Sequence, residues 1–111
     1  MSKPLVSILM NCYNGEKYLN EALNSVINQT YKNWELVFWD NLSTDKSKKI
    51  VNKIKDQRIK YFLSDIHTSQ YEARNMGLEK CSGEFIAFLD VDDYWLPTKL
   101  EEQIKLFTNS E

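Results

Sequence analysis

Three aspartates, Asp90, Asp92 and Asp93, directly follow an apolar run in this sequence of 111 residues. The run, residues 85–89, is typical of a short strand buried on both faces, as in a parallel sheet. Side chains two apart on extended backbone point the same way, so Asp90 and Asp92 are predicted to share one cation while Asp93 points elsewhere. Hard oxygen ligands suit Mg²⁺ or Mn²⁺, which complete their shells with water and phosphate oxygens. The turn is therefore a candidate metal site for a ligand that carries phosphate.

The same turn has a simpler interpretation, because carboxylates also favour the start of a helix. A helix is predicted after it, since Pro97 suits a first helical turn. The apolar residues of this helix recur at helical spacing: Leu96, Leu100, Ile104 and Phe107. An acidic, solvated turn that merely precedes a helix explains these residues as well. The residues alone leave both interpretations open.

The elements that must position the acidic turn alternate along the chain. Strand patterns cover 5–10, 34–39, 59–63 and 85–89, and helical patterns cover about 16–29, 45–54, 69–80 and the stretch after Pro97. The first helix is predicted to face the core with Tyr18, Leu19, Ala22, Leu23, Val26 and Ile27. Gly83 suits a positive φ just after the third helix. This order predicts an α/β fold, a three-layer α/β/α arrangement around a mainly parallel sheet with right-handed crossovers.

Polar residues gather where three of the predicted strands end, in 11–14, 40–41 and 90–93. The carboxyl ends of parallel strands share one edge, where open α/β sheets bind their ligands, so the three clusters are expected to line one crevice. Arg74 is placed early in the third helix, near the same edge, where its guanidinium suits a phosphate or a base. A surface arginine is an equally good interpretation.

The composition narrows the classes of partner. Lys and Arg (14) nearly match Asp and Glu (16), and the net charge of −2 indicates no basic face for a nucleic-acid backbone, so no nucleic-acid partner is expected. No apolar run reaches the length of a membrane span, and the start lacks a signal-peptide pattern, which predicts a cytoplasmic chain. Cys12 and Cys81 lack metal-ligand spacing and are interpreted as reduced packing residues. His67 is interpreted as a surface histidine.

Several motifs, taken together in this order, resemble the N-terminal, donor-binding part of a family 2 inverting glycosyltransferase of the GT-A fold. They are the strand and Tyr-Asn turn in 6–14, the helix ending in Gln29-Thr30-Tyr31, the strand and polar turn in 34–45, the segment Ala73-Arg74-Asn75-Met76-Gly77, and Gly83-Glu84-Phe85-Ile86 leading to Asp90-Val91-Asp92-Asp93, Trp95 and Pro97. The likeness covers nearly all 111 residues. It implies one Rossmann-like, nucleotide-sugar-binding GT-A half over residues 1–111.

The resemblance implies a donor that is a nucleotide-diphosphate sugar, with a UDP-sugar favoured. By this likeness Asp92 ligates Mn²⁺ or Mg²⁺ on the diphosphate, and Asp90 contacts the nucleotide sugar or helps organise the metal site. The other implied donor contacts are Asn11 near the nucleoside, Tyr13 and Asn14 in the first turn, Asp40 and Asn41 near the base, and Arg74. The implied reaction is attack of an acceptor hydroxyl on the anomeric carbon with inversion, while the metal stabilises the leaving nucleoside diphosphate.

This chain departs from the family pattern in two ways, which concern the nucleotide base and the general base. Where the family often has a second aspartate and then glycine, this chain has Asn41 and Leu42, so the identity of the base stays open. Family members also continue into an acceptor-binding part, so the general base is expected beyond Glu111 and little turnover is expected from these residues alone. For the full-length protein the likeness implies a saccharide or lipid-linked acceptor, synthesis of a surface polysaccharide or glycolipid, and peripheral association with the inner membrane face.

Two other classes of protein carry a similar acidic turn. Asp90 and Asp92 also resemble the nucleophile turn of haloacid-dehalogenase-like phosphatases, but that family needs a later lysine and further acidic residues, whereas one helix follows here. A receiver-like signalling module needs an acidic pair after its first strand, where this chain has Asn11 and Cys12. Both alternatives predict an aspartyl phosphate after treatment with acetyl phosphate. The transferase interpretation predicts no such adduct.

Overall fold

The computed structural model describes residues 3–108, and strands and helices alternate through them as the sequence predicts. The elements are β1 (Val6–Cys12), α1 (Glu16–Ile27), β2 (Trp34–Asp40), α2 (Ser47–Asn52), β3 (Ile59–Leu63), α3 (Gln70–Leu78), β4 (Phe85–Phe88) and α4 (Lys99–Thr108). The observed ends differ from the predicted ones by a few residues. Within residues 3–108, no helix is long and apolar enough to cross a membrane.

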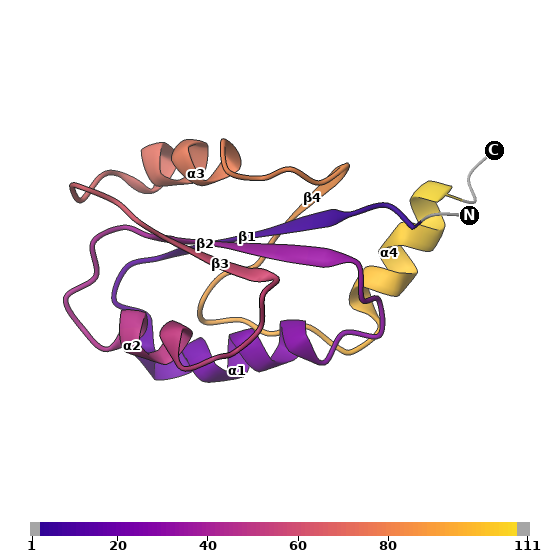
Figure 1. Cartoon of the computed structure of the whole chain (residues 1–111), viewed down its shortest axis with the longest axis horizontal. Coiled ribbons are helices and arrows are strands. Elements are labelled where there is room, and N and C mark those ends of the chain that lie inside the picture. The colour runs from indigo at the N-terminus through magenta and orange to yellow at the C-terminus, as the bar shows by residue number, and fades with distance from the viewer. Residues whose placement is uncertain (1–2, 109–111) are drawn as a thin grey trace.

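The four strands form one parallel sheet in the order β3-β2-β1-β4. Helix α3 covers one face of this sheet, α1 and α2 cover the other, and α4 lies toward the end at which β1 begins (Figure 1). The predicted three-layer α/β/α arrangement is therefore confirmed. Cys12 pairs with Asp40 and Asp40 with Leu63, so the carboxyl ends of β1, β2 and β3 are level with one another.

The core lies between the two central strands and α1. Every residue of β2 is buried, as are the residues of β1 apart from Asn11, because these strands have a neighbour on each side and helices on both faces. Helix α1 buries Leu19, Ala22, Leu23 and Val26. Tyr18 differs from its predicted core position, because it is 47% exposed.

Strand β4 differs from the prediction of a strand buried on both faces. It lies at one edge of the sheet and pairs with β1, while α3 packs over β1 and β2. Ile86 and Phe88 are therefore 45% and 48% exposed. In α4, Leu100 and Ile104 are buried as predicted, whereas Leu96, before the helix, and Phe107 are 70% and 63% exposed. Phe107 stacks on Phe85 with ring centroids 5.0 Å apart.

In the loop between α3 and β4, glycine is needed at position 83 for a different reason from the one predicted. None of the glycines in residues 3–108 has a positive φ, so Gly83 does not end α3 in that way. A Cβ on Gly83 would lie 2.7 Å from the carbonyl oxygen of Leu5 and from the amide nitrogen of Ser7. Glycine is needed at this position because the loop backbone lies directly against β1.

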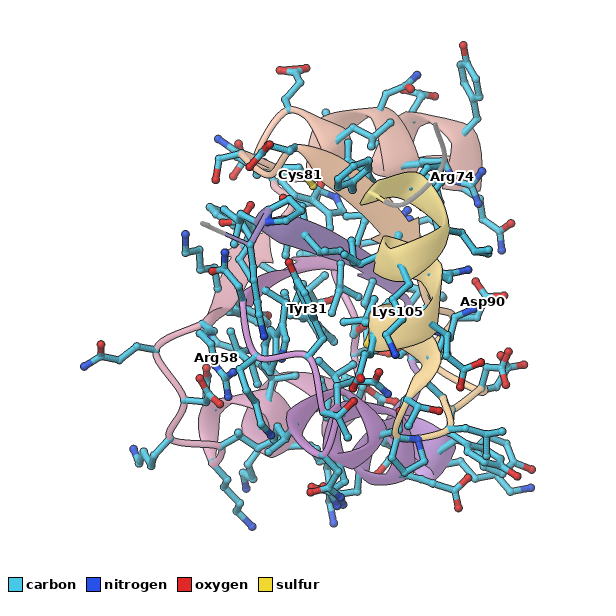
Figure 2. The ribbon with its side chains drawn as sticks, turned by 90° about the vertical axis from the view of Figure 1, so that its right-hand side faces the viewer. Tyr31, Arg58, Arg74, Cys81, Asp90 and Lys105 are labelled. Carbon is cyan, nitrogen blue, oxygen red and sulfur yellow. The ribbon has the colours of Figure 1, made fainter. Side chains whose placement is uncertain are left out.

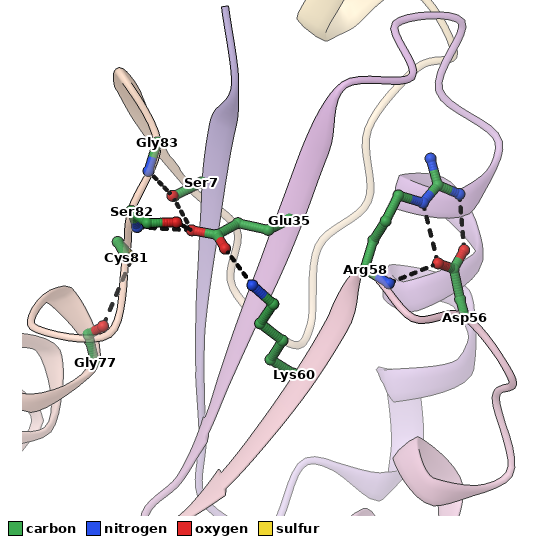
Figure 3. A network of polar contacts seen from close by, with 9 residues as sticks. All are labelled: Ser7, Glu35, Asp56, Arg58, Lys60, Gly77, Cys81, Ser82 and Gly83. Carbon is green, nitrogen blue, oxygen red and sulfur yellow. Dashed lines mark hydrogen bonds and ion pairs between the residues drawn. The ribbon is translucent and has the colours of Figure 1, made fainter.

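Buried Glu35, near the start of β2, fastens the same loop (Figure 3). Its Oε2 accepts hydrogen bonds from the hydroxyl of Ser7 and from the backbone amide of Ser82, the latter at 2.7 Å. Its Oε1 accepts from Lys60 Nζ at 2.8 Å. Burial would raise the pKa of Glu35, but these hydrogen bonds outweigh burial and lower the pKa to about 2.

Candidate functional site

The carboxyl edge of the sheet carries a cleft of about 540 Å³. It lies between the turn that joins β1 to α1 and the acidic turn that follows β4. The lining residues are Asn11, Tyr13, Asn14, Gly15, Lys17, Tyr18, Gln70, Asp90, Val91 and Asp92. Five of the residues predicted for the site therefore meet in one cleft. Lys17, Tyr18 and Gln70 join them from the first turns of α1 and α3, where the sequence showed an ordinary helical pattern.

The backbone geometry that brings Asp90 and Asp92 together is not the predicted one. Strand β4 ends at Phe88, and the amide of Asp93 donates to the carbonyl of Asp90 at 3.1 Å, so the acids lie in a turn rather than on extended backbone. Val91 packs inward against Gly15, where an added Cβ would lie 2.8 Å from its Cγ2. Because Val91 is held inside, the aspartates before and after it are exposed.

The three aspartates differ in what their carboxylates contact. Within residues 3–108, the carboxylates of Asp90 and Asp92 make no hydrogen bond or ion pair, and Figure 2 shows Asp90 at the surface. Asp93 Oδ1 instead accepts from the amide of Tyr94 at 2.8 Å, and Asp93 lines a different hollow, beside α4. In the same part of the chain no three His, Cys, Asp or Glu residues form a metal-binding group. The protein thus offers a cation at most two carboxylates here, with room for phosphate and water ligands.

Asn14 fixes the opposite wall of the cleft. Its φ of 54° is in the left-handed region, which asparagine tolerates better than most residues. Its Oδ1 accepts hydrogen bonds from the amides of Thr44, at 2.7 Å, and Asp45, at 3.2 Å. The amide of Gly15 donates to Ser47 Oγ at 3.1 Å. These bonds join the turn after β1 to the turn after β2.

Asp40 and Asn41, predicted to approach the base, are buried and have protein partners. Asp40 accepts from the amide of Ser43 at 2.8 Å and from the hydroxyl of Tyr61. Burial and the hydrogen bond to Asp40 both raise the pKa of Tyr61. Asn41 Oδ1 accepts from the amide of Thr68 at 2.9 Å, and its Nδ2 donates to the carbonyl of Thr68 at 2.8 Å. Both side chains organise loops at the carboxyl edge and do not line the cleft.

His67 is exposed, as the sequence predicts, and it also lies next to the cleft. Its ring packs against Tyr13 with centroids 4.2 Å apart and the planes tilted by 50°. His67 Nδ1 lies 3.0 Å from the carbonyl oxygen of Asn41, which fixes Nδ1 as the donor. Tyr13 is far away in the sequence, and the fold of the loop that Asn41 holds brings the two rings together.

Arg74 lies outside the cleft, on the exposed face of β4. Its guanidinium carbon is 4.8 Å from the ring centroid of Phe88, two residues before Asp90. Arg74 and Asp90 are both at the right-hand side of Figure 2. Arg74 is therefore near the acidic turn without lining the cleft.

Gln29 holds the segment that follows the acidic turn by hydrogen bonds. Its side chain is fully buried; its Nε2 donates to the carbonyl of Leu96 at 2.7 Å, and its Oε1 accepts from the amide of Leu100 at 3.0 Å. The neighbouring Thr30 amide donates to the carbonyl of Pro97 at 2.9 Å. The segment that follows the aspartates is thus tied to the end of α1.

Comparison with known proteins gives a consistent result. The pattern described as "Glycosyl transferase family 2" matches residues 7–111. An uncharacterized glycosyltransferase of Haemophilus influenzae is 48% identical over 106 residues, covering 94% of this chain and 42% of the relative. WfgD of Escherichia coli, named as a UDP-Glc:α-D-GlcNAc-diphosphoundecaprenol β-1,3-glucosyltransferase, is 43% identical over 106 residues, covering 96% of this chain and 42% of WfgD.

A solved structure agrees with these sequence relatives. The S. aureus TarS structure of residues 1–349 in complex with UDP superposes with a TM-score of 0.88 at 30% identity, covering 94% of this chain and 32% of TarS. The 111 residues therefore span well under half of the proteins that they match. The sequence match, the relatives and the shared fold agree with the resemblance inferred from the motifs and exclude the phosphatase and receiver alternatives. The chain belongs to glycosyl transferase family 2.

Proposed function

We propose that this chain is the donor-binding part of an inverting glycosyltransferase that takes its sugar from a nucleotide-diphosphate sugar. The observation that carries the proposal is the cleft at the carboxyl edge, in which the carboxylates of Asp90 and Asp92 have no hydrogen-bond or ion-pair partner among residues 3–108. The aromatic ring of Tyr13 and the polar residue Asn11 line the same cleft. A nucleotide sugar needs these three kinds of contact, for its diphosphate, its base and its hydroxyls.

Asp92, with Asp90, is proposed to hold Mn²⁺ or Mg²⁺ against the diphosphate. The two carboxylates fit such an ion, because both are exposed to one cleft and neither forms an ion pair within residues 3–108. Such an ion offsets the charge of the leaving nucleoside diphosphate. Diphosphate oxygens and water would supply its remaining ligands.

The base is proposed to stack on the pair formed by Tyr13 and His67. Tyr13 is 49% exposed, which leaves ring surface for a ligand, and His67 is held in place through Asn41. Asp40 and Asn41 are proposed to act by positioning this end of the cleft, because their side chains bind Ser43, Tyr61 and Thr68. We propose Arg74 as a further nucleotide contact at the rim, which requires it to leave Phe88.

A UDP-sugar is the proposed donor and a lipid-linked saccharide the proposed acceptor. TarS was solved in complex with UDP and with UDP-GlcNAc, and WfgD is named for UDP-Glc and a diphosphoundecaprenol acceptor. The acceptor hydroxyl would attack the anomeric carbon from the side opposite the diphosphate and invert it. We assign the general base to a part of the full-length protein beyond Glu111. Surface polysaccharide synthesis on the cytoplasmic side of the membrane is the proposed setting.

A thermal-shift panel of UDP, GDP, CDP and TDP, each with and without Mn²⁺, tests the donor site. UDP with Mn²⁺ is expected to raise Tm, because a ligand at about 100 times its Kd stabilises the folded state by about 2.7 kcal/mol. Asp92→Ala should abolish the metal-dependent shift. Tyr13→Ala should weaken binding of every nucleotide alike, because stacking does not read the base.

Asp93→Ala is the matched control, since its carboxylate binds Tyr94 and lines another hollow. It should leave the nucleotide shift unchanged. Equal loss in Asp92→Ala and Asp93→Ala, or an unchanged shift in Asp92→Ala, contradicts the assigned metal site. The absence of a shift with all four nucleotides contradicts the donor site itself.

A further inference from the structure

The nearly even charge balance of the sequence conceals a local excess of positive charge. Half of the 14 Lys and Arg residues lie in residues 46–60, together with a single acidic residue, Asp56. Four of these lysines border one shallow hollow of about 520 Å³ over α2: Lys46, Lys48, Lys49 and Lys53. We call these four residues the lysine face. The structure thus corrects the expectation, drawn from net charge, that the chain has no basic face.

The lysine face has no assigned partner within the described chain. All four side chains are exposed, and none forms an ion pair or an aromatic contact in residues 3–108. The one carboxylate at the hollow, Asp45, accepts hydrogen bonds from the amides of Glu16, at 3.1 Å, and Ser47, at 2.9 Å. Its pKa is lowered because these bonds outweigh the effect of burial. Asp45 is thus engaged with the backbone.

Two of the other three cations of the same segment, Arg58 and Lys60, are engaged in the fold. Arg58 pairs with Asp56 at 2.7 Å and lies over the ring of Trp34 at 3.8 Å. Lys60 pairs with Glu35 at 2.8 Å (Figure 3). The lysines of the face make no such contact, so folding does not account for them.

The lysine face lies next to the donor cleft. Asn14, in the cleft wall, accepts hydrogen bonds from Thr44 and Asp45, directly before the first lysine. Gly15 donates to Ser47, the first residue of α2. Figure 1 shows α2 beside the start of α1, at the end of the molecule where β1 leads into α1. A flat anionic surface that contacts the lysine face would therefore lie close to the cleft.

We propose that the lysine face binds the anionic phospholipid headgroups of a membrane surface. This proposal rests on the proposed function in one respect, because a lipid-linked acceptor is held in a bilayer and a membrane is then the nearest extended anion. Clustered lysines are attracted to such surfaces even without an inserted apolar group. The hollow has no aromatic side chain in its lining, so it lacks the stacking surface typical of a single-stranded nucleic-acid site. Bound in this way, the chain presents its donor cleft near the headgroups.

Co-sedimentation with vesicles at low ionic strength tests the proposal without requiring any sugar transfer. The chain is expected to bind phosphatidylcholine vesicles that contain phosphatidylglycerol and to leave pure phosphatidylcholine vesicles in solution. Each lysine near an anionic surface contributes about fivefold to partitioning, so the triple variant Lys48→Gln, Lys49→Gln, Lys53→Gln should lose on the order of a hundredfold. Added salt should release the wild-type chain, because the charges are exposed.

The matched control is the triple variant Lys80→Gln, Lys99→Gln, Lys105→Gln, which removes the same charge from other surfaces. It should retain most of the binding, and circular dichroism should show both variants folded. Equal loss in the two triple variants, equal binding to both kinds of vesicle, or binding to duplex DNA in place of vesicles overturns the proposal. UDP binding, measured separately by thermal shift, should be the same in both triple variants and reports on the donor site alone.

Discussion

Leu42 shows how one residue can depart from a family pattern while the backbone keeps the shape of that pattern. The family often has glycine at this position of the turn after β2, and Leu42 has a φ of 66°, in the region that glycine favours. A Cβ in this conformation lies close to its own backbone, which costs about 1 kcal/mol or more. Leu42 is 38% exposed, so packing offsets only part of that cost. The turn therefore stores strain directly beside Asp40 and Asn41.

Leu42→Gly is expected to stabilise the chain. Removal of the left-handed strain outweighs the greater freedom of glycine in the unfolded state, so the free energy of unfolding should rise by about 0.5 kcal/mol and Tm by about 2 °C. Urea unfolding and a thermal melt measure the two quantities. Leu106→Gly, at an exposed position of α4, is the control and should lower stability by about 1 kcal/mol. A loss of stability in Leu42→Gly would show that the turn is not strained.

At the scale of elements, the residues directly after α1 hold the segment that follows the acidic turn. Gln29 satisfies a carbonyl of the loop and an amide at the start of α4, so one side chain bridges two segments that are far apart in the sequence. Thr30 adds a second, exposed link from its Oγ1 to Glu101. Before the other end of α1, Gly15 has no side chain and so leaves room for Val91 to pack against it. The residues at both ends of α1 therefore help to position the turn that carries Asp90 and Asp92.

Gln29→Ala is expected to destabilise the chain by about 2 kcal/mol, because it leaves the buried amide of Leu100 and the partly buried carbonyl of Leu96 without this partner. It should also weaken nucleotide binding in the presence of Mn²⁺, since the loop after Asp93 loses its anchor. Urea unfolding and calorimetry measure the two effects. Thr30→Ala removes an exposed contact between the same segments and should cost less than about 1 kcal/mol. Similar losses in the two variants would mean that Gln29 has no special role.

The sequence predicts the helices and strands better than it predicts how they are arranged. Alternating patterns and turn residues predict the elements correctly, because burial in a parallel sheet imposes long apolar runs such as β2. They do not give strand order, and that order leaves Ile86 and Phe88 of β4 exposed at an edge. The pairing of Asp90 and Asp92 was predicted from extended backbone, whereas Val91 produces it by packing on Gly15. The contact of His67 with Tyr13 depends on a loop conformation that has no local signature.

For the whole molecule, the two ends of the sheet serve different purposes. The carboxyl end keeps two carboxylates, those of Asp90 and Asp92, exposed beside a cleft. The amino end buries one carboxylate, Glu35, and surrounds it with donors from β1, β3 and the loop after α3 (Figure 3). These hydrogen bonds stabilise the amino end of the sheet only while Glu35 is ionised. The pH dependence of unfolding should therefore report on Glu35 more than on the acidic turn.

The depressed pKa of Glu35 fixes the direction of this dependence. A carboxyl group with an unfolded pKa of 4.5 and a folded pKa of about 2 stabilises the fold above pH 4.5, and this stabilisation is lost as the pH falls through that window. The full contribution is on the order of 3 kcal/mol. Lys60 is half exposed, so solvent screening makes this an upper value.

Glu35→Gln isolates the contribution, because glutamine matches the protonated acid in shape and lacks its charge. At pH 7 the variant should be less stable than the wild type by up to about 3 kcal/mol, and the difference should shrink steadily between pH 4.5 and pH 2. Urea unfolding at a series of pH values measures it. Glu79→Gln makes the same charge change at an exposed position and should differ little from the wild type at every pH. A Glu35→Gln difference that stays constant down to pH 2 would mean that Glu35 keeps an ordinary pKa in the fold, and that shape rather than charge holds the loop against β1.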